Sequence, residues 1–376
     1  MKATIEDPAA AQILAPSFGL RFSGINATME TVVPALTRRV SIACCGANLS
    51  DDLPRTTLTR WLQNPSGHRV RIFHARRNND MVVGIVLRWF LGRRLKLLFT
   101  SAAQRRHTRW TRWLYRRMDA VIATTGRAAE LLDRDATVIR HGVDHERFHP
   151  GPSAAVRRAL GLPDRPTIGV FGRLRPQKGT GDLIEAAIRV FAETPDWRIV
   201  FVGAATPEHQ PDVERWQRRI ADAGLHERIV FQGYVHEFAD LPRWHRAMDV
   251  TACVSRNEGF GVTCLEALAT ERPVLATRAG AWAEILEEGR TGWLANPGDI
   301  DSIENALRRV VATPDGERRK MGREGRRTIE ARYTVAHEAD RIEAVYRRLL
   351  ADDPHSRVDL TTDSVVTTVA ADRKAA

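Results

Sequence analysis

The chain alternates short apolar runs with longer amphipathic stretches, and this alternation occurs in both halves. Short continuous apolar runs rich in valine and isoleucine are typical of strands buried inside a parallel sheet. We predict strands within 13–16, 40–44, 69–75, 96–100, 120–124, 167–171, 198–203, 228–235, 249–254 and 273–277. Apolar residues recur at helical spacing between several of them, as in 24–36, 81–91, 108–117, 181–192, 213–223 and 262–270, and again over 335–350.

Strands that alternate with helices predict parallel sheets, and the pattern occurs once in each half. The run Pro150-Gly151-Pro152-Ser153 has the composition of a linker. We therefore predict an α/β protein with two Rossmann-like domains, residues 1–152 and 153–333, followed by a helix over 334–350. Residues 351–376 lack a helical pattern and are expected to be a disordered tail.

Cysteine usage and the distribution of apolar residues predict the compartment of the protein. The chain has 376 residues and four cysteines, Cys44, Cys45, Cys253 and Cys264, without metal-ligand spacing. This usage predicts a reducing compartment and no disulfide framework. Residues 1–8 lack the apolar stretch of a signal peptide, and the most apolar segment, 81–99, is interrupted by arginines. We expect a cytoplasmic protein.

The net charge of +11 is unevenly distributed. No acidic residue lies between Asp80 and Asp119, whereas the segment 88–117 holds ten arginines and lysines interleaved with Trp89, Phe90, Trp110, Trp113 and Tyr115. Basic residues with aromatic neighbours suit an anionic surface. Three interpretations remain: a lipid surface or lipid-linked substrate, a solvated face of an ordinary helix, and nucleic acid.

The stretch 255–267 carries the most specific chemistry. It joins a predicted strand to a helix through Gly259 and Gly261, whose lack of a side chain lets a ligand approach the first N–H groups of that helix. Glu258 and Glu266 lie on either side, and carboxylates accept hydrogen bonds from hydroxyl groups. An anion site between two carboxylates predicts a nucleotide-sugar pocket. The alternative is a loop whose glutamates are only solvated.

A second loop, 172–179, follows the first strand of the second half. Arg173 offers a planar fork to phosphate oxygens and Lys178 a point charge. The sequence Lys178-Gly179-Thr180 lacks the spacing of a P-loop. Surface basic residues in a turn are the alternative. Asp299-Ile300-Asp301 looks like a metal motif, but its place after Pro297-Gly298 predicts a helix cap, so we expect no metal.

Polar residues follow the predicted strand of 69–75. Because ligands bind beyond the carboxyl ends of strands in open α/β sheets, His74, Arg76, Arg77 and Asn78 are candidate acceptor contacts. A single histidine at such a place is more often a structural hydrogen-bonding residue. The glycine loop that ends at Gly24 is weak evidence by itself.

Two sets of residues resemble glycosyltransferase family 4, whose members are retaining enzymes of GT-B fold. They are Glu258 and Glu266 with Gly259-Phe260-Gly261 between them, and Gly172-Arg173 with Lys178-Gly179. The resemblance implies catalytic roles for Arg173, Lys178 and Glu258, no metal, no other cofactor, and a final helix, 334–350, that crosses back to the first domain. It implies that the donor is bound by Gly24, Gly172, Arg173, Lys178, Tyr234, Val235, Glu258, Gly259, Phe260, Gly261, Val262 and Glu266.

Within that family, the segments 21–24, 74–78 and 97–108 resemble alphaproteobacterial lipopolysaccharide-core mannosyltransferases. This implies transfer of mannose from GDP-mannose to the inner-core Kdo of a lipid A precursor, at the cytoplasmic face of the inner membrane through segment 88–117. The acceptor-side candidates become Arg21, His74, Arg76, Arg77, Asn78, Gln104 and His107. Many family members have a histidine directly after the strand that ends at 100, whereas here Ser101-Ala102 occupies that place.

Other functions stay open from the sequence. A family 4 transferase could use a UDP-sugar on another glycolipid or polysaccharide. A GT-B nucleotide-sugar epimerase would convert the donor without any acceptor. A nucleic-acid-binding protein would use the basic segment, although it would leave the Glu258 and Glu266 loop unexplained.

Overall fold

A computed structural model describes residues 7–19, 24–64, 70–90, 92–235 and 240–351 of the chain. The chain divides into two units, each with its own parallel sheet. Unit 1 comprises residues 1–142 together with 335–376, and unit 2 comprises residues 143–334. The sequence placed the boundary at 152/153, but residues 143–152 belong to unit 2 because Val143 and the backbone around Phe148 are hydrogen-bonded to Tyr333 and Arg326. The predicted tail, 351–376, lies almost wholly outside the described residues.

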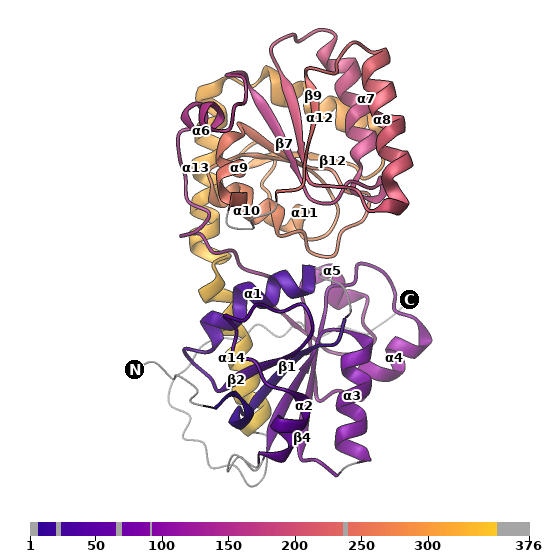
Figure 1. Cartoon of the computed structure of the whole chain (residues 1–376), viewed down its shortest axis with the longest axis vertical. Coiled ribbons are helices and arrows are strands. Elements are labelled where there is room, and N and C mark those ends of the chain that lie inside the picture. Colours follow the sequence, from indigo (N-terminus) through magenta and orange to yellow (C-terminus); the bar gives the residue numbers. More distant parts are fainter. Residues whose placement is uncertain (1–6, 20–23, 65–69, 91, 236–239, 352–376) are drawn as a thin grey trace, which may run out of the picture. The chain divides into compact units, whose positions relative to one another are not determined.

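Unit 1 is built around a sheet in the order β2-β1-β3-β4-β5-β6 (Figure 1). The strands are β1 (Ile13–Ser17), β2 (Ile42–Gly46), β3 (Arg71–Ala75), β4 (Leu95–Ser101), β5 (Ala120–Ala123) and β6 (Thr137–Val138). The helices are α1 (Gly24–Leu36), α2 (Leu58–Gln63), α3 (Asn78–Trp89), α4 (Arg109–Tyr115), α5 (Gly126–Glu130) and α14 (Val335–Ala351).

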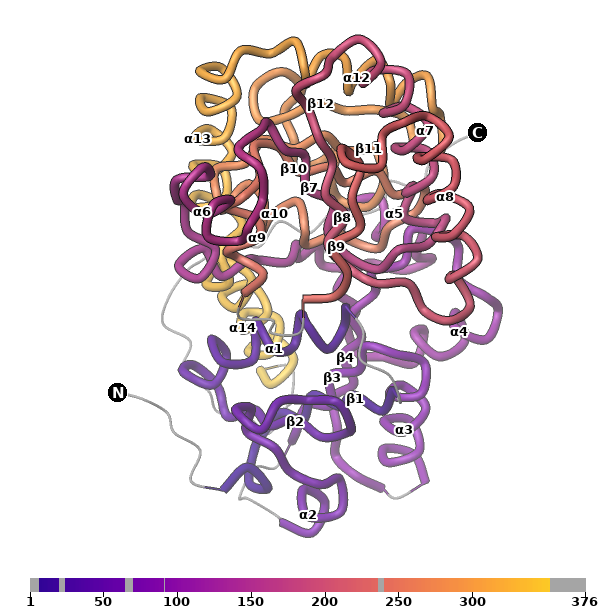
Figure 2. The backbone as a smooth tube through the Cα atoms, turned by 45° about the horizontal axis from the view of Figure 1, so that its top comes forward, coloured from indigo at the N-terminus to yellow at the C-terminus, as the bar shows by residue number. Residues whose placement is uncertain are grey.

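Both faces of this sheet are covered, which explains why its strands are apolar throughout rather than alternating. One apolar cluster joins the strands to α3 and α4, and a second joins them to α1 and α14. Figure 2 shows α1 and α14 side by side, although they lie near opposite ends of the chain. The last helix therefore completes the core of the first unit.

Unit 2 has the sheet order β12-β11-β10-β7-β8-β9. The strands are β7 (Thr167–Phe171), β8 (Arg198–Val202), β9 (Ile229–Gly233), β10 (Val250–Cys253), β11 (Val274–Thr277) and β12 (Gly292–Ala295). The helices are α6 (Ser153–Ala159), α7 (Thr180–Phe191), α8 (Gln210–Asp222), α9 (Leu241–Ala247), α10 (Thr263–Ala269), α11 (Trp282–Ile285), α12 (Ile300–Ala312) and α13 (Asp315–Arg332). Helices α7, α8 and α12 cover one face, and α10, α11 and α13 the other.

The strand orders locate where each sheet can bind a ligand. In an open parallel sheet, the crevice lies beyond the carboxyl ends of the two strands at which the order reverses. In unit 2 these neighbours are β7 and β10, and in unit 1 they are β1 and β3. The loops that the sequence singled out, 172–179 and 254–262, follow β7 and β10, and the residues from Arg76 onward follow β3.

Several elements differ from the sequence-based expectations. Helix α3 begins at Asn78 rather than near Met81, because Asp80 caps its first turn. Helices α12 and α13 were not predicted as elements. The expected helix cap at Asp299 is confirmed, since its side chain accepts a hydrogen bond from the Ser302 N–H at 2.9 Å.

Candidate active site

The two loops at the reversal point of unit 2 are joined by an ion pair. Lys178 lies in a short 3₁₀ turn, η2 (Pro176–Lys178), and its ammonium group contacts the Glu258 carboxylate. The same carboxylate accepts hydrogen bonds from the Ser255 hydroxyl at 3.3 Å and from the Gly259 N–H at 3.1 Å. Two residues that the sequence placed on different parts of a donor are thus in direct contact here.

A second pair, which the sequence analysis missed, fixes the same loops. Asp182 in the first turn of α7 accepts two hydrogen bonds from the Arg256 guanidinium, at 2.7 and 2.5 Å. The Arg256 N–H also donates to the Gln177 carbonyl at 2.9 Å, so backbone and side chain both tie the loop after β10 to the loop after β7.

Two glycines permit this close arrangement. Gly179 has a φ of +71°, and a Cβ there would lie 1.9 Å from the Val254 carbonyl oxygen. Gly261 has a φ of +87°, and the indole N–H of Trp282 donates to its carbonyl at 2.9 Å. A larger residue at either place would separate the loops or strain the backbone.

Glu266, on α10, is more buried than Glu258. Its residue is 9% exposed, and its Oε2 is 3.5 Å from Nε2 of His245, a fully buried residue on α9. The His245 ring stacks on Phe171 at the end of β7, with ring centroids 3.8 Å apart. His245 carried no signal in the sequence, because nothing in a short amphipathic helix marks which side chain faces a distant carboxylate.

Other predicted donor residues surround these loops. Gly172 directly follows β7, and Arg173 is exposed with no ion pair among the residues that the structure describes. Phe260 is buried, and its carbonyl accepts from the Ala281 N–H at 3.1 Å. Tyr234 and Val235 follow β9, with Tyr234 65% exposed. Beyond β7 and β10, unit 2 therefore presents the exposed Arg173 guanidinium, the ammonium–carboxylate pair of Lys178 and Glu258, and the nearly buried Glu266 carboxylate.

In unit 1, Asp80 organises the equivalent place. This buried carboxylate accepts hydrogen bonds from the N–H groups of Arg76, Arg77 and Phe18, at 3.1, 2.9 and 3.3 Å. It therefore joins the loop after β3 to the loop after β1. Burial raises its pKa, and the three backbone donors act in the opposite direction. An aspartate in the first turn of a helix is the sequence signal that could have found it.

The candidate acceptor residues differ in availability. Arg77 donates to the Asn26 side chain at 2.9 Å and to the Ser17 hydroxyl at 3.3 Å, and Asn78 donates to the Thr111 hydroxyl at 2.9 Å. Arg76 has a buried Nη1 with no acceptor among the described residues. All three lie at the carboxyl end of β3, as the sequence predicted, but Arg77 and Asn78 already bind neighbours within unit 1.

His74 is not available to an acceptor in this structure. Its side chain is completely buried, and its ring nitrogens bind the Tyr346 hydroxyl and the Thr100 hydroxyl, both at 2.7 Å. Burial lowers its pKa well below the ordinary histidine value, and the charge of Arg76 acts in the same direction. We correct the acceptor role: His74 is a neutral structural residue that connects β3, β4 and α14.

The remaining candidates come from other segments of the chain. Gln104 donates to the Thr125 hydroxyl at 2.8 Å, and His107 Nε2 is 3.0 Å from the Ser101 hydroxyl. Burial lowers the pKa of His107. Gly24, a predicted donor residue, is the first residue of α1 in unit 1, so its donor role stays a prediction. Arg21 lies outside the described residues.

Neither a metal cluster nor a membrane-spanning helix occurs among the described residues. No cluster of three or more histidine, cysteine or acidic residues in this part of the chain could hold a metal ion. None of the helices in the described ranges is long and apolar enough to cross a membrane. Burial raises the pKa of Cys253 and Cys264, which lie in the core of unit 2 and are not candidate nucleophiles.

Known proteins resemble this chain in sequence. The family model described as glycosyl transferases group 1 matches residues 165–313. The lipopolysaccharide core biosynthesis mannosyltransferase LpcC of Rhizobium leguminosarum bv. viciae is 42% identical over 91% of this chain and 97% of its own length. The corresponding mannosyltransferase LpsB of Rhizobium meliloti (strain 1021) is 39% identical over 90% of this chain and 98% of its own length.

Solved structures agree on the fold. Anabaena Alr3699/HepE, solved in complex with UDP and glucose, has a TM-score of 0.76 at 20% identity, covering 89% of this chain and 99% of that one. Sucrose-phosphate synthase from Thermosynechococcus elongatus has a TM-score of 0.73 at 18% identity, covering 91% and 99%. With the sequence matches and the two six-stranded parallel sheets, they show that the chain belongs to the group 1 glycosyl transferases, glycosyltransferase family 4, and is a glycosyltransferase of GT-B fold.

Proposed function

We propose that this glycosyltransferase moves mannose from GDP-mannose to the inner core of lipopolysaccharide, onto a Kdo-lipid A type acceptor, with retention of configuration. One observation carries the proposal: two relatives that match over about nine tenths of the chain, at 42% and 39% identity, are named lipopolysaccharide core mannosyltransferases. The donor loops of unit 2 supply chemistry that fits such a reaction.

The ion pair between Lys178 and Glu258 is suited to exchange for a donor. A diphosphate offers Lys178 a stronger anionic partner, and the exposed Arg173 guanidinium can bind phosphate oxygens in two places. Glu258 would then accept hydrogen bonds from the hydroxyl groups of the sugar. Nearby, Glu266 is available to the ribose. Binding the donor would therefore replace a contact within the protein by contacts to both ends of the substrate.

The difficult charge in the reaction develops on the leaving nucleotide diphosphate. As the bond between the anomeric carbon and the phosphate oxygen breaks, Arg173 and Lys178 stabilise the new negative charge. The acceptor hydroxyl attacks the same face, and its proton passes to the departing phosphate oxygen. Electrostatic stabilisation by a positioned group of this kind contributes roughly 3–4 kcal/mol. No residue of the chain is required as a covalent nucleophile.

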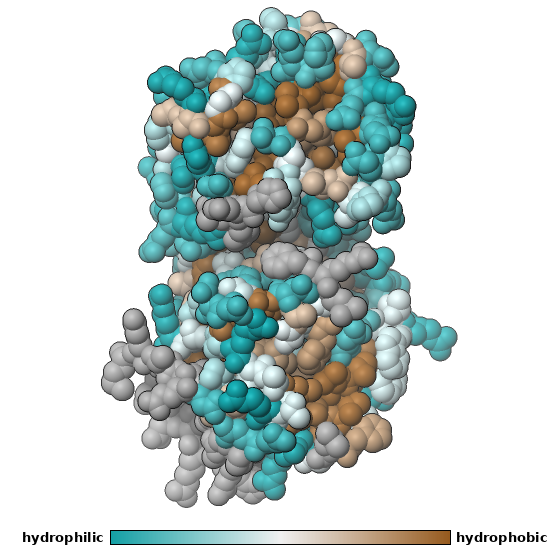
Figure 3. Space-filling view, viewed as in Figure 1, coloured by the Kyte–Doolittle hydropathy of each residue, from teal (hydrophilic) through white to brown (hydrophobic). Residues whose placement is uncertain are grey.

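We further propose that unit 1 binds an anionic membrane. The basic aromatic surface comprises Trp89, Phe90, Trp110 and Trp113 with Arg109, Arg112, Arg116 and Arg117. Trp89, Phe90 and Trp110 each expose more than half of their surface. Trp110 and Trp113 stack with centroids 5.1 Å apart, and the Arg117 guanidinium lies 3.6 Å from the Trp113 ring centroid. Figure 3 shows hydrophobic side chains gathered over α3 in unit 1.

This surface suits the head-group region of a bilayer, where aromatic rings are partly buried and arginines bind phosphate. A solvated helix face would not need several exposed aromatic residues beside one another. A lipid-linked acceptor would then be presented by the membrane to which unit 1 binds. The protein is accordingly proposed to act as a peripheral enzyme on the cytoplasmic side of the inner membrane.

A panel of donors tests the function. The purified enzyme is incubated with Kdo-lipid A and GDP-mannose, UDP-glucose or UDP-N-acetylglucosamine, and the product linkage is determined by NMR. We expect transfer from GDP-mannose with an α-linked product. Preference for a UDP-sugar would overturn the donor assignment, and an inverted linkage would overturn the mechanism. Conversion of the donor without any acceptor would indicate an epimerase instead.

Vesicle flotation tests the membrane proposal. The wild type should float with vesicles that contain phosphatidylglycerol, and the Trp110→Ala/Trp113→Ala variant should float about tenfold less well. Arg215→Gln, at an exposed arginine on α8 of unit 2, is the control. Equal flotation of all three proteins, or a steep salt-dependent affinity for generic DNA or RNA lost in the tryptophan variant, would contradict the proposal.

A further inference from the structure

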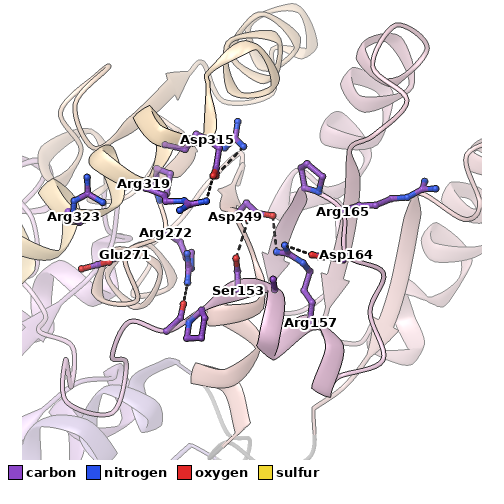
Figure 4. A pocket seen from close by; sticks show the side chains of 16 residues that line it. Ser153, Arg157, Asp164, Arg165, Asp249, Glu271, Arg272, Asp315, Arg319 and Arg323 are labelled. Atoms are coloured by element: carbon purple, nitrogen blue, oxygen red, sulfur yellow. Dashed lines mark hydrogen bonds and ion pairs between the residues drawn. The ribbon is translucent and has the colours of Figure 1, made fainter.

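Unit 2 has a second candidate binding site at the end of its sheet opposite to the donor loops. A cavity of about 540 Å³ lies at the amino ends of β7, β10 and β11, where Pro166, Asp249 and Pro273 directly precede the strands (Figure 4). The donor loops leave the carboxyl ends of the same strands. A five-residue strand spans roughly 16 Å, so one nucleotide-sugar phosphate does not reach both places.

The cavity is lined by an excess of positive charge. Its walls include six arginines, Arg157, Arg165, Arg272, Arg318, Arg319 and Arg323, and four acidic residues. Figure 4 shows Arg319 of α13, Arg272 and Arg157 toward the middle of the opening, with Arg323 and Arg165 at its opposite sides. A surface with more guanidinium groups than carboxylates attracts anions.

Close packing of α13 builds this arrangement. Gly322 of α13 faces the backbone before β11, and a Cβ there would lie 2.1 Å from the Glu271 carbonyl oxygen. The helix therefore approaches the strand ends within backbone contact. This brings Arg318, Arg319 and Arg323 of the helix beside Arg272 of the neighbouring segment, so the charge cluster is a fixed part of the fold.

Three of the arginines form the inner wall. Arg157 donates to the Ala247 carbonyl and to Asp249, both at 3.0 Å, and Arg272 donates to the Gly151 carbonyl at 2.5 Å. Arg318 donates to the Thr313 carbonyl. The Nε atom of each is buried and has no acceptor among the described residues. Most buried donors in proteins have an acceptor, and water or an anion in the cavity can supply one here.

The outer wall includes two cations that form no ion pair with any residue the structure describes. Arg165 and Arg323 are exposed and form no ion pair within the described ranges, whereas Arg319 pairs with Asp315. Burial lowers the pKa of Arg272 and of Arg318. The inner arginines are thus partly satisfied by the fold, and the outer ones remain available to a ligand.

We propose that this cavity, which we call the arginine cavity, binds a phosphate group of a second ligand, distinct from the donor. Guanidinium groups bind phosphate oxygens through paired hydrogen bonds, and a cavity of this volume is within the usual range for small ligands. The phosphate belongs either to a soluble molecule or to a lipid head group. In both cases, Arg319 lies toward the opening, Arg165 and Arg323 at its opposite sides add positive charge around the ligand, and the buried arginines shape the cavity.

Pyrophosphate binding tests the soluble source. The experiment uses the full chain with Arg173→Ala and Lys178→Ala, because these substitutions remove the two cations of the donor loops. Inorganic pyrophosphate is titrated into this protein, and binding is followed by phosphorus NMR. We expect saturable binding that weakens about tenfold or more when Arg165→Ala, Arg319→Ala and Arg323→Ala are added. Arg332→Ala, at an exposed arginine at the end of the same helix and outside the cavity, is the matched control and should leave binding unchanged.

Vesicle flotation tests the lipid source. The arginine triple variant and the Arg332→Ala control are compared on phosphatidylcholine vesicles with and without phosphatidylglycerol, both proteins keeping the basic aromatic surface of unit 1. Loss of binding to the anionic vesicles in the triple variant alone supports a lipid phosphate. The proposal is overturned if the triple variant and the control bind pyrophosphate equally, or not at all, and also float equally. Because the donor loops are not needed for either measurement, failure here leaves the proposed transferase function standing.

Discussion

The two units connect the loops at their reversal points in different ways. In each unit, an aspartate in the first turn of a helix connects the loops after two neighbouring strands. In unit 1, the fully buried Asp80 accepts hydrogen bonds from backbone N–H groups of both loops. In unit 2, Asp182 forms an ion pair with Arg256, whose side chain is 53% exposed. One connection is fully buried, and the other is partly exposed to solvent.

The titratable residues near the two reversal points also differ in burial. The histidine at the end of β3 is buried with both nitrogens satisfied, whereas Lys178 and Glu258 form a partly exposed pair. A buried satisfied network rigidifies a core, and an exposed pair can be exchanged for a ligand at small cost. We infer that unit 1 presents a fixed surface at its reversal point and unit 2 an adjustable one. Four predictions test this contrast, in order of decreasing expected effect.

The largest effect is expected from Lys178→Ala in unit 2. It should lower kcat about 100-fold or more, because a cation that stabilises the leaving diphosphate contributes roughly 3 kcal/mol to the transition state. Steady-state kinetics measure this, with Lys320→Ala on the surface of α13 as control. Full turnover of Lys178→Ala would show that the pair with Glu258 is only structural.

The two aspartates should differ in their effect on stability. Asp80→Ala leaves three backbone N–H groups without an acceptor and should lower the free energy of unfolding by about 3 kcal/mol. Asp182→Ala releases an arginine that water can solvate, so about 1 kcal/mol is expected. Urea denaturation of both variants measures the difference. Equal losses would remove the contrast between a fixed and an adjustable loop.

The buried histidine gives a third test. Tyr346→Phe and Thr100→Val each remove one partner of His74 and should each lower the free energy of unfolding by roughly 1–2 kcal/mol, with kcat nearly unchanged. The double variant should lose a different amount from the sum, because both partners act through one ring. If either substitution lowered kcat at unchanged stability, His74 would have to contact the acceptor after all.

The smallest effect concerns pH. Burial lowers the pKa of His74 in the folded chain below its unfolded value, so the neutral ring stabilises the fold above about pH 6.5. This stability is lost as the pH falls, by about 1 kcal/mol between pH 7 and about pH 5.5. His107, whose pKa burial also lowers, contributes in the same direction. Urea denaturation of His107→Gln across this range isolates His74, and a flat profile would mean that its ring becomes charged without cost.

Local patterns were enough to predict most of the secondary structure and the loops that carry the chemistry. A strand buried on both faces must be apolar throughout, and a loop that lets two backbones meet needs glycine, as at Gly179 and Gly261. The stretch 172–179 and the stretch that begins at 255 each follow a strand of unit 2, as the sequence predicted. These features depend on residues that are close in sequence.

Only the tertiary structure decided which side chains meet. Lys178 and Glu258 are 80 positions apart, Asp182 and Arg256 are 74 apart, and His74 and Tyr346 are 272 apart. Such contacts depend on strand order and on which face of a helix is buried, and a local sequence pattern determines neither of them. The arginine cavity is the clearest case: its arginines come from α6, from α13 and from the segments before β7 and β11, and no single stretch of sequence contains them. The sequence by itself therefore determined the elements and the kinds of loop, while packing determined whether a charged residue became a structural partner or remained free to bind a ligand.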